Sequence, residues 1–86
     1  DLGSWNAVYD ELPKRKDGNL VKGVGVVIDG KNNFIHNEDH FTAVVGLDNI
    51  IVISTDDATL IVNKDNVEDV RKAVKFLNDK YRQDLL

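Results

Sequence analysis

The sequence has no cysteine and no methionine, and only one proline among its 86 residues. The lack of cysteine excludes a disulfide framework and a thiolate-bound metal. Long apolar runs are missing as well. The longest is Ile50–Ile53, whereas a helix that crosses a bilayer needs about 20 apolar residues. Because the chain starts at Asp1 and lacks methionine, we expect it to be a fragment of a longer protein.

Positive charge is scarce, since 11 Lys and Arg residues stand against 15 Asp and Glu residues, for a net charge of −4. Proteins that bind nucleic acids present a basic surface to the phosphates. We therefore expect no nucleic-acid partner, and the short apolar runs predict no membrane partner either. A content of 42% hydrophobic residues is typical of a folded domain rather than of a disordered chain.

An apolar stripe at helical spacing predicts a short helix at the start of the chain. Its members recur at i, i+3, i+4 and i+7, so that they share one face, and are Trp5, Val8, Tyr9 and Leu12. Ser4 is suited to cap the first turn, and Pro13 lacks the amide hydrogen that a further turn would need. We expect a helix over residues 4–12.

The middle of the chain consists of short apolar runs separated by turn-forming residues. The runs are Val24–Ile28, Phe34–His36, Phe41–Val45, Ile50–Ile53 and Leu60–Val62. Their centres lie eight or nine residues apart, and their β-branched content favours extended backbone. The pattern predicts five short strands, arranged either as a meander, sandwich or small barrel, or as the rungs of a β-helix.

A second apolar stripe predicts an amphipathic helix at the end of the chain. Its members, in steps of three and four residues, are Val67, Val70, Val74, Leu77 and Tyr81. Asp65 is a candidate N-cap, with Glu68 as its capping-box partner. This face predicts packing against the strands or against an adjoining domain.

Two acidic clusters contain residue types that serve in metal binding or acid–base chemistry. The segment His36–His40 holds two imidazoles and two carboxylates. Its H-x-x-x-H spacing brings both rings to one point only on a helix, and here we expect strand and turn. Asp56 and Asp57 form a carboxylate pair in an Asp-rich turn, where aspartate commonly bonds its own backbone. We interpret both clusters as surface turns.

Two further features suggest phosphate binding without completing a site. The basic run Lys14–Lys16 is flanked by acidic residues, which weaken its field. Gly23 and Gly25 do not complete a G-x-G-x-x-G or P-loop motif. The sequence therefore predicts no catalytic residue and no cofactor-binding residue in this chain.

The chain resembles the C-terminal portion of bacterial mannose-1-phosphate guanylyltransferases. The similarity begins with the D-L-G-S-W-x-A segment at Asp1–Ala7 and runs in order along essentially the whole chain. The matching segments are Leu12–Pro13, Asp17–Asn19, Val21–Gly23, Ile28–Asn33, Glu38–His40, Val44–Asn49, Val52–Thr55, Asp57–Ala58 and Asp69–Val74.

The resemblance implies a fold and a function. Enzymes of this family are nucleotidyltransferases that use Mg²⁺ to transfer GMP from GTP to mannose 1-phosphate, giving GDP-mannose and pyrophosphate. Residues 1–23 correspond to the end of the catalytic domain and a connector, and residues 24–86 to the C-terminal module. The implied fold is mainly β with flanking helices: a small, irregular left-handed β-helix of short strands, a short N-terminal helix and an amphipathic C-terminal helix. Because the strand period is near nine, regular hexapeptide rungs are not expected.

The resemblance also implies one metal-site residue. In sugar nucleotidyltransferases the aspartate that opens the D-x-G segment helps to hold Mg²⁺, and the matching position is Asp1. A hard cation at phosphates needs further oxygen ligands, which would come from outside this chain.

Three roles for the chain remain open from the sequence. In the first, the chain is the inactive C-terminal module of a cytoplasmic enzyme and docks on its own catalytic domain through the Trp5 face and the Val67–Tyr81 stripe. In the second, it is a self-standing binding or assembly module that forms homo-oligomers through an exposed strand edge. In the third, it joins the transferase to a downstream isomerase domain.

Overall fold

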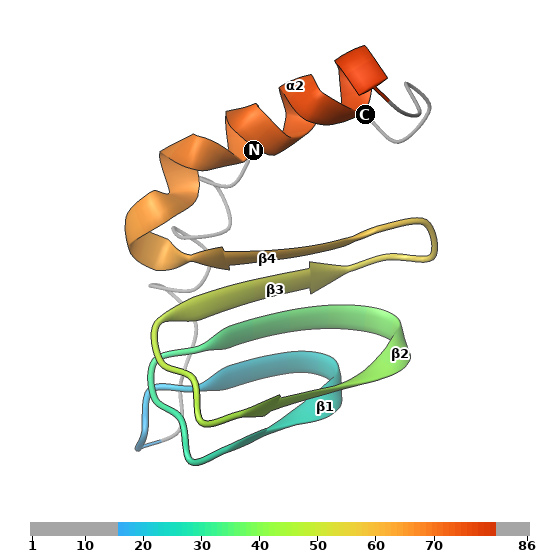
Figure 1. Cartoon of the computed structure of the whole chain (residues 1–86). Coiled ribbons are helices and arrows are strands. Elements are labelled where there is room, and N and C mark those ends of the chain that lie inside the picture. The colour runs from blue at the N-terminus through green and yellow to red at the C-terminus, as the bar shows by residue number, and fades with distance from the viewer. Residues whose placement is uncertain (1–15, 81–86) are drawn as a thin grey trace.

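The computed structural model describes residues 16–80, which form one stack of strands followed by a helix (Figure 1). The elements are β1 (Leu20–Ile28), β2 (Phe34–Val45), β3 (Ile50–Ser54), β4 (Thr59–Asn63), a 3-10 helix η1 (Lys64–Asp69) and an α-helix α2 (Val70–Lys80). The predicted N-terminal helix over residues 4–12 lies outside the described residues. Within residues 16–80, no helix is long and apolar enough to span a bilayer.

The strands stack in the order β1-β2-β3-β4, and the first three are parallel. Parallel neighbours normally need a crossover of a dozen or more residues, yet only residues 29–33 separate β1 from β2. The chain avoids a crossover because each long strand bends back on itself. β1 pairs with β2 once over residues 20–23 and again over residues 25–28, on the far side of the bend.

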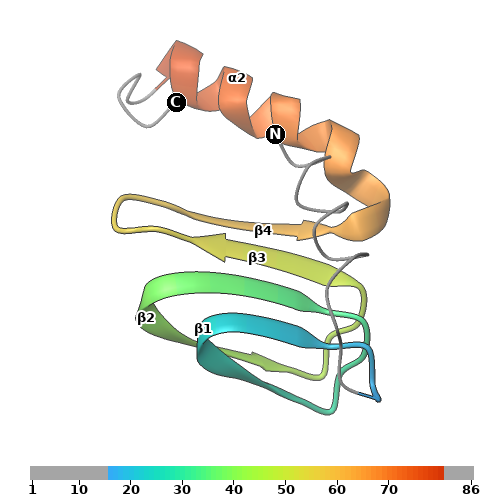
Figure 2. The same cartoon turned by 180° about the vertical axis from the view of Figure 1, so that it is seen from behind.

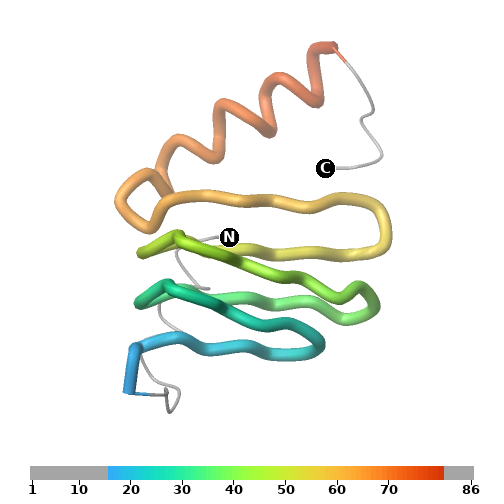
Figure 3. Tube along the Cα trace, turned by 60° about the horizontal axis from the view of Figure 1, so that its bottom comes forward, coloured from blue at the N-terminus to red at the C-terminus, as the bar shows by residue number. Residues whose placement is uncertain are grey.

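Each coil therefore has two arms. Leu20 pairs with Phe34 and Phe34 with Ile51, so the chain returns to the same place after 34 − 20 = 14 and then 51 − 34 = 17 residues. Figure 3 shows these flattened coils lying one above the other. The β-helix prediction is confirmed, and its left hand stays a prediction. The spacing of eight or nine residues seen in the sequence, however, is the distance from one arm to the next and not from one coil to the next. The runs at Phe34–His36 and Phe41–Val45, for example, are the two arms of the single strand β2.

The last predicted rung is different from the others. β4 pairs antiparallel with β3 through a tight turn closed by a 2.9 Å bond from the Thr55 amide to the Ala58 carbonyl. The predicted strand at Leu60–Val62 is confirmed as β4, but it turns back and ends the stack instead of adding a further parallel arm (Figure 2). The physical reason is the short Thr55–Ala58 connection, which has room for a hairpin but not for a second arm.

A ladder of buried asparagines joins successive coils. The Asn19 side chain accepts a bond from the Asn33 amide (2.9 Å) and donates one to the Gly30 carbonyl (2.8 Å). Asn33 repeats the pattern one coil higher, accepting from the Ile50 amide (2.8 Å) and donating to the Leu47 carbonyl (2.7 Å). Both side chains are completely buried. Each asparagine thus satisfies two backbone groups at the corner where the next coil begins.

Two apolar clusters fill the two sides of the first arms. Between the arms lie Val27, Ile35, Val44 and Val52. On the outer face of the first arms, Phe34 and Ile51 are completely buried, and Val67 of η1 and Val70 of α2 pack against them. The stripe that predicted the C-terminal helix therefore begins in η1 and does cover the strands.

The start of the C-terminal helix differs in detail from the prediction. Asn63, not Asp65, is the N-cap, and its side-chain oxygen accepts a 2.8 Å bond from the Asp65 amide. The Asn49 side-chain amide donates to the same oxygen at 3.2 Å. Asn63 takes the cap position instead of Asp65 because it is the last residue of β4 and lies next to Asn49. The Asn63 side chain therefore both caps η1 and bonds to the coil below.

We predict that Asn33→Ala strongly destabilises the chain, because it removes a completely buried side chain and leaves the part-buried Ile50 amide and Leu47 carbonyl without their partner. Each such group costs about 1–3 kcal/mol. Urea unfolding would measure the loss. As a control, Asn78→Ala removes an exposed asparagine of α2 and should change stability by about 0.5 kcal/mol or less. Equal effects of the two substitutions would contradict the role of the ladder.

Candidate docking surfaces

The two histidines of the segment His36–His40 lie in different environments. His36 is partly buried in the first arm of β2 and pairs with Ile53 across the stack, whereas His40 is exposed at the bend of β2. Among residues 16–80, no group of three or more His, Asp or Glu side chains is placed to hold a metal ion. The segment lies within β2, where the strand bends. Asp1, the predicted Mg²⁺ residue, lies outside the described residues.

Asn37 explains why β2 bends where the sequence predicts a turn. Its side chain is buried, accepts bonds from the amides of Asp39 (3.1 Å) and His40 (2.8 Å), and donates to the Thr42 hydroxyl. Gly23 of β1 lies against the Asn37 backbone with φ = +103°, and a Cβ there would overlap the Asn37 carbonyl. Gly23 therefore serves close packing of the coils rather than phosphate binding.

The acidic turn of Asp56 and Asp57 lies at the end of the β3–β4 hairpin, and Asp56 there faces a carboxylate of another coil. The carboxyl group next to Asp56 that acts on it most strongly is Asp39, at the bend of the coil below. Hydrogen bonding with Asp39 and the repulsion between the two carboxylates raise the pKa of Asp56, while the nearby His40 acts in the opposite direction. Asp56 is fully exposed, so the pair lacks the burial that acid–base catalysis uses to separate two pKa values.

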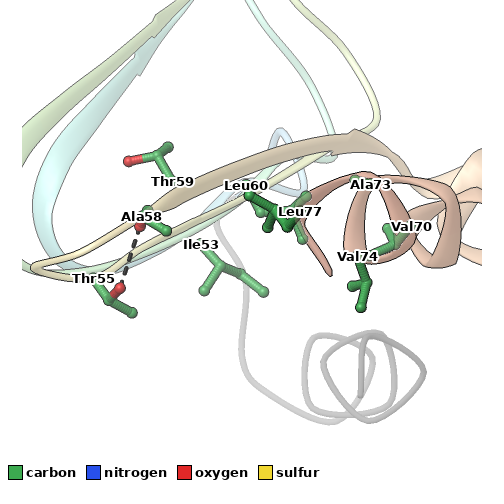
Figure 4. Close-up of a pocket in the computed structure, with 9 residues that line it drawn as sticks. All are labelled: Ile53, Thr55, Ala58, Thr59, Leu60, Val70, Ala73, Val74 and Leu77. Atoms are coloured by element: carbon green, nitrogen blue, oxygen red, sulfur yellow. Dashed lines mark hydrogen bonds between the residues drawn. The ribbon is translucent and has the colours of Figure 1, made fainter. Parts of the chain in front are cut away.

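An apolar groove lies between α2 and the β3–β4 hairpin (Figure 4). Its volume is about 280 Å³. The lining is apolar apart from two threonine residues and consists of Ile53, Thr55, Ala58, Thr59, Leu60, Val70, Ala73, Val74 and Leu77. The groove exists because α2 touches the buried core only through its first turn, and no side chain along Val70–Lys80 is buried. The apolar stripe of the C-terminal helix thus packs on the core at Val67 and Val70. Its later members, Val74 and Leu77, line the open groove instead.

A second apolar surface lies on the outer face of the second arms. We call the residues that form it the apolar strip: Val26, Ile28, Phe41, Ala43 and Val45. They alternate with the inward-facing Val27 and Val44 and so point away from the core. Phe41 is 67% exposed, Val45 59% and Ile28 47%. None of the five residues is charged.

Sequence reasoning missed the strip, although the sequence carries a signal for it. A strand with one face in water alternates apolar and polar residues, whereas a strand buried on both faces is a nearly continuous apolar run. Val24–Ile28 and Phe41–Val45 are of the second kind. The pattern is therefore that of strands with apolar residues on both faces, as the structure shows for β1 and β2.

Comparison with protein families identifies the stack. The profile of the family described as "MannoseP isomerase/GMP-like beta-helix domain" matches residues 23–77, which contain most of β1, the other three strands, η1 and most of α2. The chain belongs to this family.

Curated relatives share this domain within much longer proteins. The chain is 36% identical over 84 residues to a mannose-1-phosphate guanylyltransferase of Klebsiella pneumoniae and 37% identical over 82 residues to one of Escherichia coli. It is 38% identical over 84 residues to the alginate biosynthesis protein AlgA of Pseudomonas aeruginosa. These matches cover 95–98% of the chain but only 17–18% of each relative, in its C-terminal part.

A solved structure supports the fold. The crystal structure of a protein from Thermus thermophilus, described as a mannose-1-phosphate geranyltransferase, matches with a TM-score of 0.74 and 26% identity. The match covers 86% of this chain and 23% of that one. The coils are therefore shared with that structure, in which they make up about a quarter of the chain.

We predict that Asp56→Asn raises the melting temperature at neutral pH and has little effect at acid pH. The pKa of Asp56 is raised in the fold, so the stabilising protonated pair is present below the ordinary carboxyl pKa and is lost as the pH rises through the raised value. Asparagine removes the repulsion but keeps a hydrogen-bonding group. Thermal melts across the acid range would measure the effect, with Asp57→Asn as the control. A pH-independent difference would contradict the pairing.

Proposed function

We propose that this chain is the C-terminal module of a cytoplasmic mannose-1-phosphate guanylyltransferase. The observation that carries the proposal is the match of nearly the whole chain to guanylyltransferases of two bacteria at 36% and 37% identity. The full-length protein would transfer GMP from GTP to mannose 1-phosphate and release pyrophosphate. The chain by itself is a structural module without activity, since the nucleotide and sugar sites would lie in the part of the protein that precedes it.

The proposed role of the module is to dock on its catalytic domain through the apolar strip. Five apolar side chains on one sheet face, three of them 47–67% exposed, form a contiguous patch of the kind that marks interaction sites. From the sequence, the docking face was expected at the Trp5 face and the Val67–Tyr81 stripe. The strip is the better candidate because Val67 and Val70 are already used in packing on the module's own core.

Asp1 is proposed to help hold Mg²⁺ in the full-length protein. A carboxylate is a suitable oxygen ligand for this cation, which usually keeps several waters and binds substrate phosphates. When bound, the ion would supply charge neutralisation at the phosphates. Asp1 would contribute one ligand and position the ion, and further ligands would come from the catalytic domain.

The activity is tested with the full-length protein that carries this chain. We expect it to convert GTP and mannose 1-phosphate to GDP-mannose with Mg²⁺, and Asp1→Asn to lower the turnover at least about tenfold, the loss typical of a removed interaction with a catalytic metal. The 86-residue chain should be inactive, and neither substrate should shift its melting temperature, because a ligand without a site does not stabilise the fold. Turnover by the chain alone, or unaltered turnover of Asp1→Asn, would overturn the corresponding assignment.

Docking through the strip is tested with Val45→Asp in two contexts. In the 86-residue chain the exposed side chain should tolerate the change within about 0.5 kcal/mol. In the full-length protein the buried carboxylate should cost several kcal/mol and separate the module from the catalytic domain. Ile61→Asp, an exposed apolar residue of β4 outside the strip, is the matched control. If the strip instead joins two modules, the chain alone would sediment as a dimer that Val45→Asp dissociates, and docking on the catalytic domain would be refuted.

A further inference from the structure

The third coil has a first arm but no second arm. β1 and β2 each run through a first arm, a bend and a second arm, whereas β3 leads through a tight turn into the antiparallel β4. β3 pairs with β2 only along the first arm, residues 51–54 with residues 34–37. Among the described residues, the second arm of β2 therefore has a strand neighbour on one side only, which is β1. We call its other side, along Thr42–Val45, the open edge.

The backbone groups of Ala43 and Val45 point to the open edge. The Gly46 amide donates to the Ile28 carbonyl of β1 at 2.8 Å. Because the amides of a strand alternate between its two sides, the Val44 amide points to β1 as well, and those of Ala43 and Val45 point away from it. The carbonyl of each residue points to the same side as its amide. The open edge thus offers two amides and two carbonyls to a further strand.

The residues of the open edge favour pairing. Exposed edge strands in natural proteins commonly carry lysine or proline, which block pairing with another chain. Residues 41–45 contain neither a charge nor a proline, and four of the five are β-branched or aromatic, the types that favour strands. β1, at the other end of the stack, does carry an exposed lysine, Lys22. The open edge therefore has the composition of a strand that is paired on both sides.

The space beside the open edge suits a single strand rather than a second copy of this chain. β3 and β4 continue the stack of first arms for two strands beyond the level of β2 (Figure 1), which is about 10 Å at a spacing of about 4.8 Å. A second copy that paired with the open edge, in either direction, would bring its own first arms into the place of β3 and β4. An extended segment avoids this overlap, because it carries no layer of first arms.

We propose that one extended segment of the catalytic domain pairs with the open edge and takes the place of the missing second arm. This inference rests on the proposed function, since it names how the docked domain contacts the module. The apolar strip lies on the outer face of the same arm, so a domain that covers the strip reaches the open edge beside it. The chain matches only 17–18% of each relative, and the remainder is long enough to supply such a segment.

The chemistry of the segment follows from its place. Main-chain bonds to the open edge give affinity in this mode of recognition, and contacts of alternate side chains give specificity. Every second residue of the added strand lies on the outer face, next to Ala43 and Val45 of the strip. We therefore expect an uncharged segment whose outward residues are apolar.

Amide hydrogen exchange in the full-length protein tests the proposal without a substitution. The Val44 and Gly46 amides, which face β1, are the internal control and should exchange slowly in any case. With an added strand, the Ala43 and Val45 amides exchange at least about tenfold more slowly than unpaired amides, because each is held by a hydrogen bond. Fast exchange at Ala43 and Val45 beside slow exchange at Val44 would overturn the proposal.

Ala43→Pro provides a second measurement in the full-length protein. Proline removes the amide that faces the open edge and none that faces β1, and it is tolerated where the amide side of a strand is unpaired. We expect the Val45 amide to exchange at least about tenfold faster in this variant, because the added strand is lost. Ala43→Ser, which keeps the amide and nearly the size, is the matched control and should leave the exchange unchanged. If Ala43→Pro does not fold, the exchange pattern of the unsubstituted protein decides the question.

These outcomes are distinct from those of the docking test. If Val45→Asp separates the module from the catalytic domain while Ala43 and Val45 of the unsubstituted protein exchange fast, the strip docks by its face alone and the added strand is refuted. If Val45→Asp has no effect and both amides exchange fast, docking and strand addition are both refuted. Protection of Ala43 and Val45 that increases with protein concentration would assign the strand to a second protein molecule and would also overturn the proposal.

Discussion

The asparagine ladder is the interaction on which the stack depends. A β-helix of such coils has a corner where the chain must leave one strand and enter the next, and the backbone groups there have no strand partner. Asn19 and Asn33 supply the same two bonds at successive corners, one to an amide and one to a carbonyl of the next coil. Because both side chains are buried, these bonds form away from water, where an unsatisfied group would be costly. The ladder thereby sets the register of one coil on the next.

The end of the ladder explains the end of the fold. The third coil carries Asn49, which bonds to Asn63 instead of to another corner, and Asn63 in turn caps η1. The stack therefore stops where its repeating contact is replaced by a helix cap. The hairpin at Thr55–Ala58 has the same result, since β4 returns antiparallel and presents no further arm on which to build.

The flattened coil has two apolar faces in addition to its interior, and they differ in how they are covered. The outer face of the first arms holds Phe34 and Ile51 and is covered by η1 and the start of α2. The outer face of the second arms, the apolar strip, has no cover among the described residues. A module of this size buries a limited share of its surface, and among the described residues it uses its helices to cover the first of these faces only.

The sequence by itself determined the strand-forming runs, the C-terminal helix and the family, because these depend on residue type, local spacing and long collinear similarity. It left the arrangement of the strands open until the family resemblance was used, since eight-to-nine-residue spacing suits several β architectures. Only the tertiary structure decided that two such runs make one coil, that β4 turns back, and that Asp39 of another coil acts on Asp56. The reason is that all three features depend on how many residues the chain uses at each bend. That number determines which residues of successive coils lie next to one another. The three asparagines that precede Leu20, Phe34 and Ile50 were visible in the sequence, but their meaning appeared only when the coils placed them one above another.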